Sequence, residues 1–303
     1  MRAFALPGFD DSPALVDLPV PQPGPGEVLV RVQASSINGI DLAVVYGAMR
    51  DYMEYRFPVV VGKDFAGTVE ALGEGVSRFA VGETVFGVVK DLGDGALRDY
   101  LTIGEADTIA SVPDGLPVAA AGALGWAGTA ALDSLAAVKP EPGTFLLISG
   151  ATGGVGALAT QYAALAGVHV IATARPGAEA DLMTGLGAAH VVDYTGDLAA
   201  QVRAIAPAGV PAALHLAGDT AVLAGLLAEG GRLASTLGYL PGAHPALLSV
   251  VADATVDKLR RLADDAAAGR ISVPSTRSHP LEDTGQALAD FGAGTLGKIA
   301  ITF

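Results

Sequence analysis

The stretch that decides the fold is Ile148-Ser149-Gly150-Ala151-Thr152-Gly153-Gly154-Val155-Gly156, which runs on into ALATQYAALAG. The apolar run before it predicts a strand, the glycines predict a tight turn, and the following residues predict a helix that begins near Val155. Small residues let the backbone approach two phosphates, and the free N–H groups of a helix start attract them. A tight strand-to-helix connection without a ligand is the alternative interpretation. The motif predicts a cradle for a dinucleotide pyrophosphate, with candidate contacts at Ala151, Thr152, Gly153, Gly154 and Val155.

Segments on both sides of this turn alternate between helical and strand patterns. In chain order they read WAGTAALDSLAAV, TFLLISG, ALATQYAALAG, VHVIATA, AEADLMTGLG, HVVDY, LAAQVRAIA, AALHLAG, TAVLAGLLAEG and GRLASTL. The first is expected as a helix, the second as a strand, and so on in alternation. Alternating strands and helices at this spacing predict a parallel doubly wound sheet, and therefore an α/β protein.

The residues before about 109 have a different pattern, with short β-branched runs such as EVLVRVQASSI and ETVFGVV between turn-forming segments. This pattern predicts an antiparallel, barrel-like region. After an amphipathic helix at VDKLRRLADDAAAG, the last segment returns to strand, helix and strand. It is a candidate to rejoin the first domain.

Composition narrows the function classes. A chain of 303 residues suits two domains, and its net charge of −14 disfavours nucleic-acid and anionic-membrane partners. The absence of cysteine excludes disulfides and cysteine-ligated zinc. Residues 115–132 and 143–174 are long and almost uncharged, but proline and glycine interrupt them, so we expect no membrane insertion. The start lacks the apolar core of a signal peptide, which favours a cytoplasmic protein.

The end of the second expected strand bears on the choice of cofactor. Sites that prefer NAD carry an acid there, whereas a 2′-phosphate favours a cation. This strand ends in Ala172-Thr173-Ala174-Arg175, and Tyr194 ends the next one. A solvated loop arginine and a strand-end aromatic are the simpler interpretations. The joint placement of Arg175 and Tyr194, with no acid at the strand tip, predicts NADPH, with Thr173, Arg175 and Tyr194 in its site.

None of the five histidines is spaced like a metal ligand, so no metal site is predicted. His215, in PAALHLAG, stands at the end of an expected strand. No arrangement typical of a serine hydrolase is apparent.

The chain resembles the medium-chain dehydrogenase/reductase superfamily, and within it the zinc-free, zeta-crystallin-like quinone oxidoreductases. The resemblance covers nearly the whole length. It rests on PGPGEVLVRVQASSINGIDL, FPVVVGKDFAGTVEALGEGVSRFAVGETVFG, GALRDYLTI, ISGATGGVG, LGAAHVVDY, GGRLASTLG and HPLEDTGQALADFGAGTLGKIAITF. It implies a GroES-like β-barrel domain at residues 1–121, rejoined by 271–303, around a Rossmann NADPH-binding domain at 122–270. A homodimer is also expected.

The resemblance implies a reaction without zinc. Zinc-bearing relatives carry an early cysteine and a Gly-His-Glu in place of Gly62-Lys63-Asp64, and this chain has neither. Without zinc, the resemblance implies hydride transfer from NADPH to an already polarised acceptor, which is a quinone or an α,β-unsaturated carbonyl.

Several site residues follow from the matching motifs. Asn38 and Asp41, in SSINGIDL, are expected near the nicotinamide as catalytic residues, although capping of a helix start is the simpler role for both. Thr129 is expected to touch the nicotinamide side. The cofactor set is completed by Ala217, Gly218, Leu237 and Gly238.

The proton donor is less defined by the motifs. Where the family has a tyrosine, two residues after the aspartate, this chain has Ala43. The longer loop that follows supplies Tyr46, Tyr52 and Tyr55 as replacements. We take Tyr52 as the candidate that hydrogen-bonds the acceptor oxygen, with water as the other proton source and loop packing as the simpler role for the tyrosines.

Two further functions stay open at the level of sequence. An enoyl-thioester reductase acting on acyl or polyketide chains shares the barrel, the glycine turn and the lack of zinc. A nucleotide-binding regulatory protein that has lost turnover is the other, in keeping with Ala43.

Overall fold

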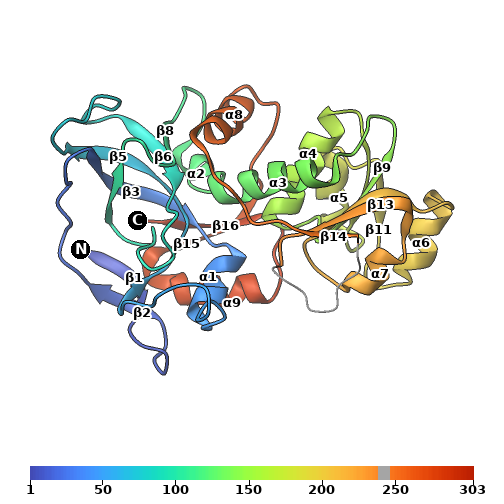
Figure 1. Ribbon diagram of the computed structural model, residues 1–303, viewed down its shortest axis with the longest axis horizontal. Coiled ribbons are helices and arrows are strands. Elements are labelled where there is room, and N and C mark those ends of the chain that lie inside the picture. The colour runs from blue at the N-terminus through green and yellow to red at the C-terminus, as the bar shows by residue number, and fades with distance from the viewer. Residues whose placement is uncertain (238–245) are drawn as a thin grey trace. The chain divides into compact units, whose positions relative to one another are not determined.

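The computed structural model describes residues 1–237 and 246–303, and its contacts divide the chain into two units (Figure 1). The first unit comprises Met1–Trp126 and Ala254–Phe303, and the second comprises Ala127–Asp253. The first unit is therefore built from both ends of the chain. The exact domain bounds given by the sequence stay a prediction.

The first unit contains two sheets. Its three-stranded sheet has the order β2-β1-β4, and its seven-stranded sheet has the order β15-β16-β3-β5-β6-β8, with β7 paired to β3. The bounds are β1 Arg2–Leu6, β2 Ala14–Asp17, β3 Glu27–Ser36, β4 Val59–Val60, β5 Asp64–Leu72, β6 Thr84–Val88, β7 Tyr100–Gly104, β8 Ile109–Ser111, β15 Ser275–Pro280 and β16 Lys298–Thr302. Pairing is antiparallel except between β15 and β16.

The last strand of the chain lies beside one of the first. β16 pairs with β3, and Ala300 opposes Ser36 (Figure 1). This pairing brings Lys298 next to the start of α1. The helices of this unit are α1 Gly39–Val45, α2 Val118–Ala121, α8 Val256–Ala267 and α9 Thr284–Gly292, with a 3-10 turn at Leu281–Asp283 and the first residues of α3.

The second unit holds one parallel sheet. Its strand order is β11-β10-β9-β12-β13-β14, with bounds β9 Phe145–Ser149, β10 His169–Thr173, β11 His190–Val192, β12 Val210–His215, β13 Leu227–Ser235 and β14 Leu247–Ser249. The order runs outward in both directions from β9 and β12, which is the doubly wound arrangement that the sequence predicts. The helices are α4 Gly154–Leu165, α5 Ala178–Gly185, α6 Leu198–Ile205 and α7 Thr220–Ala224, together with most of α3 Gly125–Val138.

The segment TAVLAGLLAEG departs from the sequence prediction. The expected helix ends at Ala224, and β13 already begins at Leu227. Leu227 pairs with Val210, and the register shifts before Ala212 pairs with Arg232. The helical periodicity of this segment predicts the wrong structure from Leu227 onward, because pairing with β12 fixes an extended backbone there.

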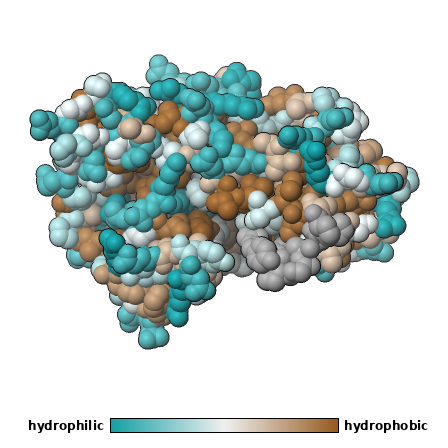
Figure 2. All heavy atoms as spheres, viewed as in Figure 1, coloured by the Kyte–Doolittle hydropathy of each residue, from teal (hydrophilic) through white to brown (hydrophobic). Residues whose placement is uncertain are grey.

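Hydrophobic and hydrophilic residues are intermingled on the face drawn in Figure 2. Large exposed apolar side chains include Tyr46, Tyr52 and Val251. Within the described residues, no helix combines the length and the apolar character needed to cross a membrane.

Candidate functional site

The glycine turn lies at the end of β9, where the strand order reverses. Gly150 has a φ of +81°, and a Cβ there would meet Ala217 at 3.0 Å. Gly156 allows α4 to pack against the turn, since a Cβ there would lie 2.4 Å from the Gly150 carbonyl oxygen. Ala151 is buried, whereas Thr152 to Val155 are partly exposed. The turn therefore needs its glycines, and its accessible side is the start of α4.

The start of α4 is suited to an anion. Gly153 is the residue before the helix and has no side chain that could cap the first N–H groups. Such groups need a partner and carry the positive end of the helix dipole. Neighbouring strand ends fix the turn, since Thr173 Oγ1 accepts a hydrogen bond from the Gly150 N–H at 3.0 Å and donates to the Ile148 carbonyl at 3.2 Å.

His215 connects two further strand ends. Its Nδ1 lies 3.0 Å from Ser235 Oγ, and its Nε2 lies 3.0 Å from the Gly218 carbonyl oxygen. A carbonyl only accepts, so Nε2 carries the proton and Nδ1 accepts from the serine hydroxyl. Ser235 Oγ also accepts from the Leu237 N–H at 3.2 Å. The buried His215 thus ties the loop after β12 to the loop after β13.

Ser149 fixes the same loop from the side of the glycine turn. Its hydroxyl donates to the Ala217 carbonyl at 2.7 Å, and its own carbonyl accepts from the Leu216 N–H at 3.0 Å. The structure therefore brings Ala217 and Gly218 against the glycine turn. Leu237 is half exposed, and Gly238 lies outside the described residues.

Arg175 and Tyr194 lie close to an acid that the sequence prediction did not include. Glu179 lies in the first turn of α5, and its carboxylate accepts three hydrogen bonds from Arg175. Oε2 accepts from the backbone N–H at 2.7 Å, and Oε1 accepts from Nε at 2.8 Å and from Nη2 at 2.5 Å. Burial raises the pKa of Glu179, but the hydrogen bonds and charge of Arg175 and a hydrogen bond from Tyr194 outweigh it and lower the pKa. The strand tip itself carries no acid, but the Glu179 carboxylate reaches Arg175 from the first turn of α5.

Thr129 is buried in α3, and none of the described residues offers its Oγ1 a hydrogen-bond partner. A buried hydroxyl without a partner costs free energy unless a ligand supplies one. Together with the glycine turn and the free start of α4, this orphaned hydroxyl fits a nicotinamide dinucleotide. Its phosphates would lie at Thr152 to Val155, and Thr129 would contact another part of it.

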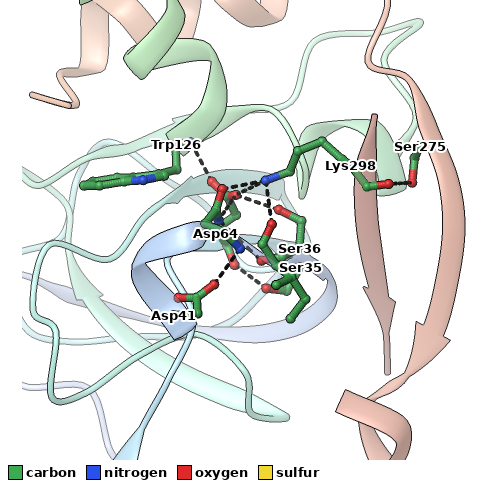
Figure 3. A network of polar contacts seen from close by, with 9 residues as sticks. Ser35, Ser36, Asp41, Asp64, Trp126, Ser275 and Lys298 are labelled. Atoms are coloured by element: carbon green, nitrogen blue, oxygen red, sulfur yellow. Dashed lines mark hydrogen bonds and ion pairs between the residues drawn. The ribbon is translucent and has the colours of Figure 1, made fainter. Parts of the chain in front are cut away.

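The second candidate cluster belongs to the first unit and is centred on Asp64 (Figure 3). Asp64 Oδ2 accepts from Ser36 Oγ at 2.6 Å and from Asn38 Nδ2 at 2.8 Å, and Oδ1 accepts from the Trp126 N–H at 2.6 Å. Lys298 Nζ lies 3.6 Å from Oδ2. Both carboxylate oxygens of Asp64 are therefore occupied by donors from the end of β3, the residue before α1, β16 and the start of α3.

Asn38 and Asp41 form the side of this cluster at α1. Asn38 precedes the helix, and the Asp41 carboxylate accepts the Asn38 N–H at 2.8 Å. Burial raises the pKa of Asp41 to about 7, and Asp64 adds to this, whereas the Asn38 hydrogen bond, Lys298 and Lys63 act against it. The structure brings the two predicted residues together, in the capping arrangement that was the simpler alternative.

Lys63 is a buried cation beside this cluster. Its Nζ donates to the carbonyls of Lys90 at 2.9 Å and Asp91 at 3.4 Å, and lies 5.1 Å from the centre of the Trp126 ring. Burial lowers the pKa of Lys63 to about 8, against the charges of Asp41, Asp64 and Asp91. A zinc site needs deprotonated ligands with free lone pairs. A buried ammonium group and a carboxylate already filled by donors do not fit one.

The predicted tyrosine is not part of this cluster. The Tyr52 residue is 73% exposed, and no contact recorded among the described residues joins it to Asn38 or Asp41. Tyr55 is held instead, because its hydroxyl donates to the Val44 carbonyl at 2.9 Å. Tyr46 is 75% exposed.

Sequence reasoning missed Lys298 and Glu179 and treated Lys63 and Asp64 only as replacements for zinc-site residues. Glu179 follows Arg175 by four residues at a helix start, a spacing that favours ion pairs and was an available signal. For Lys298 there was no local signal, since its partners lie at the other end of the chain.

Two family models match the chain. Residues 24–114 match the alcohol dehydrogenase GroES-like domain, and residues 154–257 match the zinc-binding dehydrogenase family. The quinone oxidoreductase QR1 of Triphysaria versicolor is 30% identical over 86% of this chain and 81% of its own length. The chain belongs to the medium-chain dehydrogenase/reductase superfamily and its quinone oxidoreductase-like group. It is an oxidoreductase with a GroES-like domain and an NAD(P)-binding Rossmann domain, as predicted.

Two other relatives bear on the cofactor and the acceptor. A mycobacterial protein solved in complex with NADPH has 29% sequence identity and a TM-score of 0.86, and the match covers 100% of both chains. A mycocerosic acid synthase-like polyketide synthase of Mycobacterium tuberculosis is 34% identical over 92% of this chain. That match covers 14% of the synthase, so the chain corresponds to a small part of it.

Proposed function

We propose that this protein is an NADPH-dependent reductase that transfers a hydride to a quinone or an α,β-unsaturated carbonyl without zinc. The observation that carries the proposal is the chemistry of Lys63 and Asp64, the residues that stand where zinc-bearing relatives have zinc-site residues. At this position, a buried ammonium group and a carboxylate already filled by hydrogen-bond donors do not provide the ligands with which a zinc ion would polarise an alcohol. Acceptors that are already electron-poor need no such polarisation.

The cofactor part of the proposal rests on the second unit. The accessible start of α4 receives the phosphates, Thr129 gains a partner, and the exposed face of Arg175 interacts with the 2′-phosphate. When bound, NADPH supplies the hydride from its nicotinamide. Arg175→Ala should weaken NADPH binding about ten- to a hundredfold, because it removes charge-assisted hydrogen bonds to the 2′-phosphate. It should leave NADH binding unchanged. Equal losses for both cofactors in a fluorescence titration would show that Arg175 does not discriminate.

The remaining roles fall to the first unit. Asn38 and Asp41 are proposed to orient the nicotinamide ribose or the acceptor. Asn38 is well suited to holding a fixed position, since Asp64 binds its amide nitrogen and Lys298 binds its amide oxygen. Tyr52 is proposed to donate a hydrogen bond to the acceptor oxygen as negative charge develops there. Water supplies the final proton where Tyr52 does not.

A panel of quinones, enones and enoyl thioesters, assayed by loss of reduced-nicotinamide absorbance, tests the activity. Asn38→Ala should lower kcat/KM with a quinone by more than Tyr52→Phe does. The tyrosine change should matter more with an enone, because its enolate needs greater stabilisation. NADPH binding without turnover of any acceptor would support the regulatory alternative instead.

The second candidate is an enoyl-thioester reductase acting on acyl chains. It is supported by the match to a segment of the polyketide synthase. Preference for crotonyl-type thioesters over small quinones in the same panel would favour it.

We also propose a homodimer. β14 ends the described parallel sheet, and Leu248 and Val251 near it are exposed. Light scattering should give twice the chain mass, and a monomer at assay concentration would contradict this. A cytoplasmic location stays a prediction.

A further inference from the structure

The end of β10 holds one cation and two acids. Arg175 follows the strand by two residues, and Gly177, with a φ of +96°, turns the chain into α5. The first turn of α5 brings Glu179 back to the strand end, where it binds the backbone and side chain of Arg175. Asp193, just after β11, is the second acid. The pKa of Asp193 is lowered mainly by hydrogen bonds from Thr195 and to a smaller extent by the charge of Arg175.

Glu179 occupies one edge of the guanidinium group. Its Oε1 accepts hydrogen bonds from both Nε and Nη2, and its Oε2 accepts one from the Arg175 backbone N–H. A guanidinium group has five N–H donors, so Glu179 leaves Nη1 and the second Nη2 hydrogen unused, and these are shared between a hydrogen bond to the neighbouring Tyr194 and a ligand. The Arg175 side chain is 62% exposed, whereas that of Glu179 is 13% exposed. A phosphate can therefore bind the outer edge of Arg175, but it must do so with a fixed carboxylate on the other side.

The two acids at this position weaken the attraction of Arg175 for a 2′-phosphate. Arg175 is already neutralised by Glu179, and Asp193 adds a further negative charge. A second anion gains less from a paired cation than from a free one. A ribose with free hydroxyl groups adds no negative charge and meets no such opposition.

We propose that Glu179 is a specificity-determining residue that restrains the preference for NADPH, so that the protein uses both NADPH and NADH. The inference rests on the proposed function, since it assumes that a nicotinamide dinucleotide binds at the glycine turn. Arg175 attracts the 2′-phosphate, and Glu179 limits that attraction.

The test is the ratio of the NADH and NADPH dissociation constants, measured by titration without an acceptor. Glu179→Gln removes the charge and keeps an oxygen that accepts from the guanidinium group. It should shift the ratio toward NADPH about tenfold, the effect of one nearby, partly screened charge. The pair 2′,5′-ADP and ADP, used as smaller probes, should shift by a similar factor. Both shifts should shrink at high salt.

Asp181→Asn is the matched control, because Asp181 is an exposed acid in the same helical turn that makes no recorded contact with Arg175. It should leave the ratio within about twofold, since its charge is more distant and screened. An unchanged ratio in Glu179→Gln overturns the inference, as does an equal shift in Asp181→Asn. If the wild-type protein binds neither dinucleotide, the proposed function fails instead. NADH binding by the variant shows that its fold is intact.

Discussion

Lys298 Nζ donates a hydrogen bond to Asn38 Oδ1 at 2.6 Å, although 260 residues separate them in the sequence. The same ammonium group donates to the Ile37 carbonyl at 3.0 Å and forms an ion pair with Asp64. All of these groups are buried. The last strand of the chain therefore completes a polar cluster that the first third of the chain begins.

Lys298→Met should destabilise the protein by about 3 kcal/mol, because it leaves Asp64 as a buried charge without its cation. Chemical denaturation followed by the fluorescence of Trp126, the single tryptophan, measures this. Lys90→Met, at an exposed lysine, is the control and should change little. Combining Lys298→Met with Asp64→Asn should recover part of the loss. If Lys298→Met lowers the free energy of unfolding by less than about 1 kcal/mol, the Lys298–Asp64 ion pair contributes no more than an ordinary surface ion pair.

Asp41 predicts a pH dependence of stability. Its pKa is raised from 3.8 to about 7, so the folded state binds a proton that the unfolded state has released. This contribution is fully present below about pH 4 and is lost as the pH rises through about 7. Asp41→Asn stays neutral throughout. Wild-type stability should therefore fall relative to Asp41→Asn by roughly 2–4 kcal/mol between pH 4 and pH 8.

Denaturation midpoints of both proteins across this range measure the effect. Asp10→Asn, the same change at an exposed aspartate, is the matched surface control. A constant difference for Asp41→Asn would mean that Asp41 titrates like an exposed group.

The parts of this fold that depend on local sequence were predictable. Gly150 and Gly156 identify the turn because a side chain at either position meets neighbouring atoms, and such constraints leave a pattern in the sequence. The alternating strands and helices gave the parallel sheet. TAVLAGLLAEG was misassigned because pairing of Leu227 with Val210 overrides its helical pattern.

The electrostatics of the site were less predictable. The acid at the end of β10 comes from the next helix, and the cation at Asn38 comes from the far end of the chain. Neither is adjacent to the motif that it completes. Sequence identified the capping residues Asn38 and Asp41, but the charges that surround them depend on how the strands pair.

Gly156→Ala should disrupt the glycine turn. The new Cβ would lie 2.4 Å from the Gly150 carbonyl oxygen and 2.6 Å from Ala151 Cα, and both are backbone atoms. We expect a loss of about 1–3 kcal/mol of stability from this overpacking and a large loss of NADPH affinity. Gly185→Ala, at the end of α5, is the control, since a Cβ there meets nothing within 4 Å. Normal NADPH binding by Gly156→Ala would show that the turn does not hold the phosphates.

Thr129→Val separates a ligand contact from a structural role. Thr129 Oγ1 is buried and lacks a partner among the described residues, so replacing it by a methyl group of similar shape removes an unsatisfied polar atom. The free protein should become more stable by about 1 kcal/mol. If the hydroxyl binds the cofactor, NADPH affinity should fall about five- to tenfold, the value of one hydrogen bond. Denaturation and fluorescence titration of the same sample measure both effects.

Thr160→Val provides the comparison, because Thr160 Oγ1, in α4, is also buried without a partner among the described residues. It should raise stability in the same way and leave NADPH affinity unchanged. Opposite effects on stability and binding in Thr129→Val, with an effect on stability alone in Thr160→Val, would identify the Thr129 hydroxyl as a cofactor ligand. Unchanged binding in both variants would make Thr129 a structural residue of α3 and remove it from the site.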